Sequence, residues 1–225
     1  MAELRSQRTP LLVLGLIAAI AVGFAIGVLA RLPLADRDDA PAADSVDVGF
    51  AQDMSTHHNQ AIDMAAVALT ESTDQPIKNL AFDILTTQQN QVGQMQGWLA
   101  LWNRPPTATD GYMTWMDHDS SDQHMHDADS TTGADAAAPL MPGMATTADM
   151  SALRQARGPA LDTLFLQLML RHHQGGLPMA EYAQQYADQT VVRDLAGSMV
   201  RTQQSEAELM TKMLIAQGAQ PLPMN

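Results

Sequence analysis

The chain has 225 residues and a formal net charge of −13, which allows one domain with an appendage or two small domains. The acidic balance argues against nucleic acid as a partner, because phosphate groups need a basic protein face. The sequence contains no cysteine, which excludes disulfides, thiolate metal sites and a lipoprotein anchor cysteine. Histidine, methionine and carboxylates remain as metal ligands, and the 16 methionines are a surplus for a chain of this length.

An apolar stretch lies near the N-terminus. Residues 11–30 contain neither charge nor proline, and about twenty apolar residues are enough to cross a bilayer as a helix. Arginines before this stretch and aspartates after it favour a cytoplasmic N-terminus over residues 1–10 and an extracytoplasmic remainder. We therefore expect a transmembrane anchor or an uncleaved signal, with the protein held in the cell membrane as a single-pass chain. Cleavage at residues 28–30, which would give a secreted protein, is the alternative.

The first folded segment follows a short tether. Residues 31–44, rich in proline, alanine and aspartate, form this flexible tether. Residues 45–103 then carry two amphipathic helices, expected over residues 45–70 and 76–102. A polar turn joins the two helices, so they form a first helical hairpin.

A group of potential metal ligands lies on the first helix. Met54 is followed by the adjacent pair His57 and His58, and Met64 comes six residues later. Met54 and His57 are one helical turn apart, so both can reach a metal ion in the seam of the hairpin. A buried imidazole costs free energy unless it has a partner, so packing alone gives no reason for the pair.

The second helix has a polar interruption in its apolar stripe. Gln88 and Gln91 occupy positions where a core helix prefers leucine. In an antiparallel hairpin that turns near residue 73, this interruption faces the histidine pair, and Met95 faces Met54. Gln91 is then positioned to accept the N–H of a histidine ring.

The whole hairpin is repeated with a constant offset of 115 residues. The second copy, over residues 151–220, places Glu206 where the first has Gln91 and Met210 where it has Met95. Two amphipathic hairpins bury their stripes most simply against each other, which predicts an all-α antiparallel four-helix bundle in one domain. The second ligand group is Met169, His172, His173 and Met179.

A different kind of sequence separates the two copies. Residues 104–150 contain eight aspartates and, after Arg104, no lysine or arginine. We expect this acidic linker to be largely disordered or loosely draped, except for a short helix capped at Thr147. The linker is either a solvated tether or a weak copper-collecting arm. Its methionines and histidines are Met113, Met116, His118, His124, Met125, His126, Met141, Met144 and Met150.

Copper is the metal that this donor set favours. Thioether sulfur suits Cu(I), and imidazole suits both Cu(I) and Cu(II). Structural zinc sites normally include cysteine, and di-iron bundles use Glu-x-x-His carboxylates, which the first helix does not have. The candidate metal residues are Met54, His57, His58, Met64, Met95, Met169, His172, His173, Met179, Glu206 and Met210. The alternative is that methionine fills the core and Gln91 or Glu206 satisfies structural histidines.

The duplicated Met-x-x-His-His motif, each copy closed by a methionine, resembles the bacterial family called domain of unknown function 305. Met141-Pro142-Gly143-Met144 and Phe165-Leu166-Gln167 contribute to the resemblance, which covers roughly residues 45–218. It implies a ferritin-like four-helix bundle and, as in the family's characterised members, copper binding and copper tolerance. Pro178 stands where an acidic or polar residue is more usual, which affects the expected geometry of the second site.

Three functions are compatible with these patterns. The first is an extracytoplasmic copper-binding protein that sequesters copper or hands it to a copper-handling partner protein, and is not an enzyme. The second is a ferritin-like metal-dependent oxidase, and the third is a surface interaction module that binds no metal. The sequence favours the copper-binding protein over the oxidase, because the chain has no complete Glu-x-x-His set of the kind that di-iron bundles use.

Overall fold

The computed structural model of the protein describes residues 8–31, 40–109, 111–116 and 141–225. None of these residues lies in a strand, so the expected all-α class is confirmed for the described part of the chain. The chain divides into two compact units, Met1–Ala40 and Pro41–Asn225. The second unit contains both copies of the repeat.

Helix α2 (Arg8–Arg31) belongs to the first unit. Within the part of the chain that the structure describes, no helix combines the length and apolar character that crossing a membrane requires. The predicted transmembrane anchor over residues 11–30 is therefore not supported.

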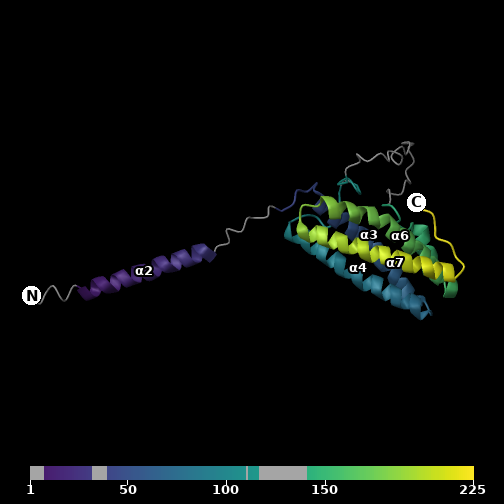
Figure 1. The fold of residues 1–225 in the computed structure, drawn as a ribbon, viewed down its shortest axis with the longest axis horizontal. Helices are drawn as coiled ribbons and strands as arrows, with labels where there is room; N and C mark the ends of the chain where they lie inside the picture. The colour runs from purple at the N-terminus through teal and green to yellow at the C-terminus, as the bar shows by residue number, and fades with distance from the viewer. Residues whose placement is uncertain (1–7, 32–39, 110, 117–140) are drawn as a thin grey trace, which may run out of the picture. The chain divides into compact units, whose positions relative to one another are not determined.

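Four long helices build the second unit, and Figure 1 shows them lying alongside one another. Helix α3 (Val46–Glu71) pairs with α4 (Gln75–Leu101), and α6 (Gly158–Tyr186) pairs with α7 (Thr190–Ala216). The two hairpins meet mainly through α3 and α6. Each pair is one copy of the repeat, so the predicted four-helix architecture is what the chain forms.

Local capping fixes where these helices begin. The Ser45 side chain accepts a hydrogen bond from the Val48 N–H at 3.3 Å, and Asp74 accepts one from Ile77 at 3.1 Å. Pro76 stands in the first turn of α4, where its missing N–H costs nothing. A short helix, α5 (Thr147–Gln155), is capped by Thr146, one residue before the predicted cap.

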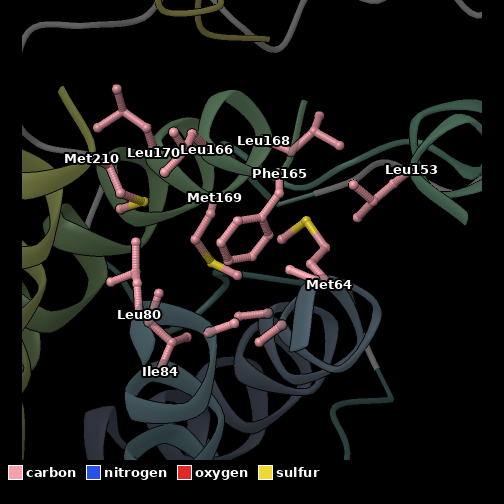
Figure 2. Close-up of a cluster of buried hydrophobic side chains, with 14 of the residues drawn as sticks. Met64, Leu80, Ile84, Leu153, Phe165, Leu166, Leu168, Met169, Leu170 and Met210 are labelled. Atoms are coloured by element: carbon pink, nitrogen blue, oxygen red, sulfur yellow. The ribbon is translucent and has the colours of Figure 1, made fainter. Parts of the chain in front are cut away.

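The core of the second unit is divided into two apolar clusters. One contains residues 61–68 of α3 and 161–170 of α6, together with the first half of α4 and the end of α7. Figure 2 shows part of this cluster, with Met64 and Met169 on either side of the Phe165 ring. The other cluster contains residues 48–54 of α3 and 179–183 of α6 with Ala187 just beyond it, together with the second half of α4 and the start of α7. Along each long helix, the residues between the two clusters include buried polar side chains.

Both described ends of the linker pack against the bundle, whereas a loosely draped segment was expected. On one side, the Asp53 carboxylate accepts hydrogen bonds from the Met113 N–H at 2.7 Å and from Trp115 Nε1 at 2.8 Å. On the other side, Met141 and Met144 are buried. These apolar side chains pack on the bundle because burial removes their surface from water. The acidic composition of the linker as a whole gave no indication of this packing. The predicted copper-collecting residues His118, His124, Met125 and His126 lie outside the described residues.

The segment after residue 140 crosses α6 at a pair of glycines. A Cβ atom at Gly175 would overlap the Pro142 carbonyl, and one at Gly143, which has a φ of +77°, would overlap the Arg171 carbonyl. Only glycine allows this approach of two backbones. Helix α6 continues through Gly175, Gly176 and Pro178.

Candidate metal centre

A buried polar layer lies between the two apolar clusters, at the middle of all four long helices. Its members form four pairs related by the 115-residue repeat, and each helix contributes two neighbouring positions. Such a layer is costly inside a bundle unless its groups find partners. The layer consists of the buried residues His57, His58, Gln88, Gln91, His172, His173 and Gln203, together with Glu206, whose side chain is 15% exposed.

Two histidines meet where α3 and α6 pack together. The ring centroids of His57 and His172 are 3.7 Å apart, with an interplanar angle of 34°. His172 Nε2 donates to the His57 carbonyl oxygen at 3.0 Å, and His57 Nε2 lies 3.3 Å from the Pro142 carbonyl oxygen. This central pair therefore joins the two copies of the repeat, whereas the sequence pattern placed each histidine in the seam of its own hairpin.

The other two histidines contact the outer helix of their own hairpin. His58 Nε2 lies 2.8 Å from Gln91 Oε1, and His173 Nε2 lies 2.7 Å from Glu206 Oε2. Both rings are fully buried. The predicted register of the hairpins is confirmed by these bonds, and so is the role of Gln91 and Glu206 as partners of a histidine ring.

The partners determine which ring nitrogen carries the hydrogen. Carbonyl and carboxylate oxygens only accept hydrogen bonds, so Nε2 donates in His57, His172 and His173, and the equivalent contact to Gln91 follows the same pattern. A neutral imidazole then has a bare lone pair on Nδ1. In three of the rings, this buried Nδ1 has no hydrogen-bond partner among the described residues, namely in His57, His58 and His173.

Burial keeps His57, His58 and His172 neutral. It lowers the pKa of His57 to about 4, against which the Pro142 carbonyl has a smaller raising effect. Burial, followed by the proximity of His57, lowers the pKa of His58 to about 3. The pKa of His172 is lowered well below its usual value, again chiefly by burial. Neutral rings with a free nitrogen are the form in which histidine binds metal ions.

The six predicted methionines are all fully buried but are divided between the two apolar clusters. One cluster contains Met54 and Met95 from the first hairpin with Met179 from the second. The other contains Met169 and Met210 from the second hairpin with Met64 from the first. Each set of three methionines therefore includes residues of both hairpins. The sequence pattern had instead placed Met64 at the site of the first hairpin and Met179 at the site of the second.

The described residues contain no group of three or more histidine, aspartate or glutamate side chains that could hold a metal ion. A metal site in the polar layer would therefore have to combine imidazole with methionine sulfur or an amide oxygen. The unpartnered Nδ1 atoms can supply the imidazole ligands of such a site. Each has a free lone pair that can bind a metal ion, and leaving a buried polar atom without any partner costs free energy.

Three contributors to the layer were not among the site residues predicted from the sequence. The Pro142 carbonyl contacts His57 from the linker, and Gln203 supplies another buried oxygen without a described partner. Gly176 leaves space for the His57 ring, since a Cβ there would lie 3.0 Å from His57 Cε1 and 3.3 Å from both His57 Nδ1 and Gln203 Oε1. The available signal was the mid-helix glycine itself, because the first copy has Ala61 at that position.

A polar groove runs between α4 and α7 beside this layer. Its volume is ≈ 380 Å³, and Gln91, Asn90 and Ser198 are among its lining residues. Since Gln91 also contacts His58, the groove brings solvent to within one side chain of a buried imidazole.

Comparisons with known proteins agree on the fold. The profile of the family described as domain of unknown function (DUF305) matches residues 47–214. A DUF305 protein from Streptomyces coelicolor that is inferred to be secreted is 39% identical, with a TM-score of 0.70, covering 81% of this chain and 99% of that one. A DUF305 fragment from Deinococcus radiodurans is 30% identical, with a TM-score of 0.58 and coverages of 76% and 96%. No curated protein sequence matches the chain.

The copper protein CopM is a more distant structural relative. Its Cu(I)-bound form is 23% identical, with a TM-score of 0.55, and the match covers 76% of this chain and 96% of CopM. At this identity, the likeness establishes the helical fold alone. CopM has also been crystallised in Cu(II)-bound, silver-bound and apo forms.

Proposed function

The chain belongs to the domain of unknown function (DUF305) family, and we propose that it binds copper through the histidines of the polar layer. The single observation that carries the proposal is the set of buried Nδ1 atoms without described partners in His57, His58 and His173. Each of these rings is oriented by a bond at its other nitrogen, which is how metal-binding histidines are commonly held.

The donor chemistry favours copper over other metals. Zinc and iron sites in helical bundles use several imidazoles and carboxylates around one ion, and the described residues provide no such group. The methionines border the polar layer on both sides, and thioether sulfur with imidazole suits Cu(I). CopM, which has the same fold and binds both copper and silver, supports the same class of soft cation.

We place the protein outside the cytoplasm, where it sequesters copper or hands it to a copper-handling partner. The relative from Streptomyces coelicolor, which is inferred to be secreted, supports this location. The groove beside Gln91 provides the route for ligand exchange with solvent or with a partner. We propose binding without catalysis.

Metal retention tests this function. The full chain would be loaded in turn with Cu(I), Cu(II), Zn(II) and Fe(II), desalted, and analysed for bound metal. We expect copper alone to be retained. A variant with all four layer histidines replaced by alanine should lose the copper, whereas replacing the exposed Asn79 by alanine should not.

Two results would contradict the proposal. If the wild-type chain retains no copper and the alanine variant only loses stability, the histidines are structural, held by Gln91 and Glu206. If the loaded protein consumes oxygen catalytically with a reductant or with Fe(II), the layer is a ferritin-like oxidase site rather than a binding site.

A further inference from the structure

The two halves of the polar layer differ in charge at one pair of positions. His58 donates to the neutral amide of Gln91 at 2.8 Å, and His173 donates to the carboxyl group of Glu206 at 2.7 Å. The positions are equivalent under the repeat, and the two bonds differ in length by only about 0.1 Å. The two histidines are therefore oriented alike, but only His173 has a partner that can carry a negative charge.

This difference matters because the layer is buried. Among its eight members, Glu206 is the one carboxylic acid; its side chain is 15% exposed, whereas the ring of its partner His173 is fully buried. A cation that enters such a layer loses its hydration and needs compensating charge. The first half offers only neutral donors to a cation at His58. The second half offers a carboxylate that acts through the His173 ring.

The benefit of that carboxylate depends on the charge of the ion. Coulomb attraction is proportional to the product of the charges, so a divalent ion gains twice the interaction free energy of a monovalent ion at the same place. A bond from a carboxylate also raises the basicity of the ring nitrogen that binds the metal. Both effects favour Cu(II) beside Glu206, and neither operates beside Gln91.

We infer that the two halves are specialised: the His173–Glu206 half holds divalent copper, and the His58–Gln91 half holds monovalent copper only. Glu206 is thus a specificity-determining residue that acts through His173 rather than as a direct ligand. This inference rests on the proposed copper function but adds to it a division of labour between the copies of the repeat.

Reciprocal substitutions test the inference in the full-length protein. Glu206→Gln makes the second half resemble the first, and Gln91→Glu makes the first resemble the second. Glu208→Gln is the matched control, because Glu208 lies on the same helix but is exposed. Bound Cu(II) is counted by electron paramagnetic resonance after desalting, and Cu(I) affinity is measured anaerobically by competition with bathocuproine.

We expect the wild type and Glu208→Gln to retain one Cu(II). Glu206→Gln should weaken Cu(II) binding about 100-fold and Cu(I) binding about 10-fold, within the range seen when a partner of a metal-binding histidine is removed. In the double variant that carries both Glu206→Gln and Gln91→Glu, the retained Cu(II) should bind to the first half instead of the second. Its resonance should then be lost in His58→Ala, whereas in the wild type it is lost in His173→Ala.

The inference is overturned if Glu206→Gln retains Cu(II) as the wild type does, or if Cu(I) and Cu(II) weaken equally. Either result leaves the proposed function intact as long as copper is still retained. If the wild type retains copper in neither oxidation state, the proposed function fails and the inference fails with it. Should Gln91→Glu not fold, Glu206→Gln alone decides the question, because the two side chains are nearly identical in shape.

Discussion

The buried histidines should make the metal-free protein sensitive to mild acid. Burial lowers the pKa of His57 to about 4 and of His58 to about 3, from a value of 6.5 for an exposed ring. Below pH 6.5 the unfolded chain therefore binds protons that the folded protein does not accept. Above pH 6.5 the neutral histidines cause no loss of stability. The free energy of unfolding then falls as the pH is lowered from 6.5 towards the pKa values of the folded protein.

The expected loss is large for a protein of this size. Each of these histidines removes about 1.4 kcal/mol per pH unit below 6.5, so each removes on the order of 2 kcal/mol at pH 5. The two together remove on the order of 4 kcal/mol, and His172 acts in the same direction because its pKa is also lowered. A typical domain has only about 5–15 kcal/mol in total.

Urea denaturation of the metal-free chain, followed by circular dichroism between about pH 7.5 and pH 5, measures this loss. Asp53 opposes the effect, because burial raises its pKa and the folded protein then binds the extra proton. Comparing the wild type with His57→Gln cancels the contribution of Asp53, which is the same in both chains. The slope of the unfolding free energy against pH should be shallower in the variant by about 1.4 kcal/mol per pH unit. A midpoint that does not change between pH 7 and pH 5, or an unchanged slope in the variant, would refute the reasoning.

Four further substitutions test the packing. Gly175→Ala should lower the free energy of unfolding by about 1–3 kcal/mol, because the new Cβ overlaps the Pro142 carbonyl. Gly93→Ala, with nothing within 4 Å of its Cβ, should instead stabilise the protein by about 0.5–1 kcal/mol, and thermal melting compares the two. Phe165→Ala should cost about 3–5 kcal/mol in urea denaturation, since the ring is fully buried; a cost below about 1 kcal/mol would contradict the described core. Asp53→Ala should cost about 1–3 kcal/mol by leaving two N–H donors unpaired, and an unchanged urea midpoint would count against these bonds.

The repeat made the hairpins predictable from the sequence. A constant offset of 115 residues and the three-four apolar spacing act locally along each helix, so they fix helix positions and the partner of each helix. Antiparallel register then follows from the turn, which is why Gln91 was expected beside the histidine pair and lies 2.8 Å from His58.

The same reasoning failed for the methionines. Met54 and Met64 share one stripe of α3, which suggested that both flank one site. Ten residues of helix span roughly 15 Å along the axis, however, so the two side chains lie on opposite sides of the polar layer and in different clusters. Helical periodicity specifies a face of a helix but does not show which residues of another hairpin cover each part of it.

The sequence by itself determined the all-helical class, the two copies of the hairpin and the histidines as the unusual feature of the core, because each follows from local spacing or composition. Only the tertiary structure decided that His57 and His172 stack across the copies, that the linker reaches His57 through Pro142, and that three Nδ1 atoms have no described partner. Those facts depend on how α3 packs against α6. The contact joins residues 115 positions apart, and no pattern along either helix specifies its rotation.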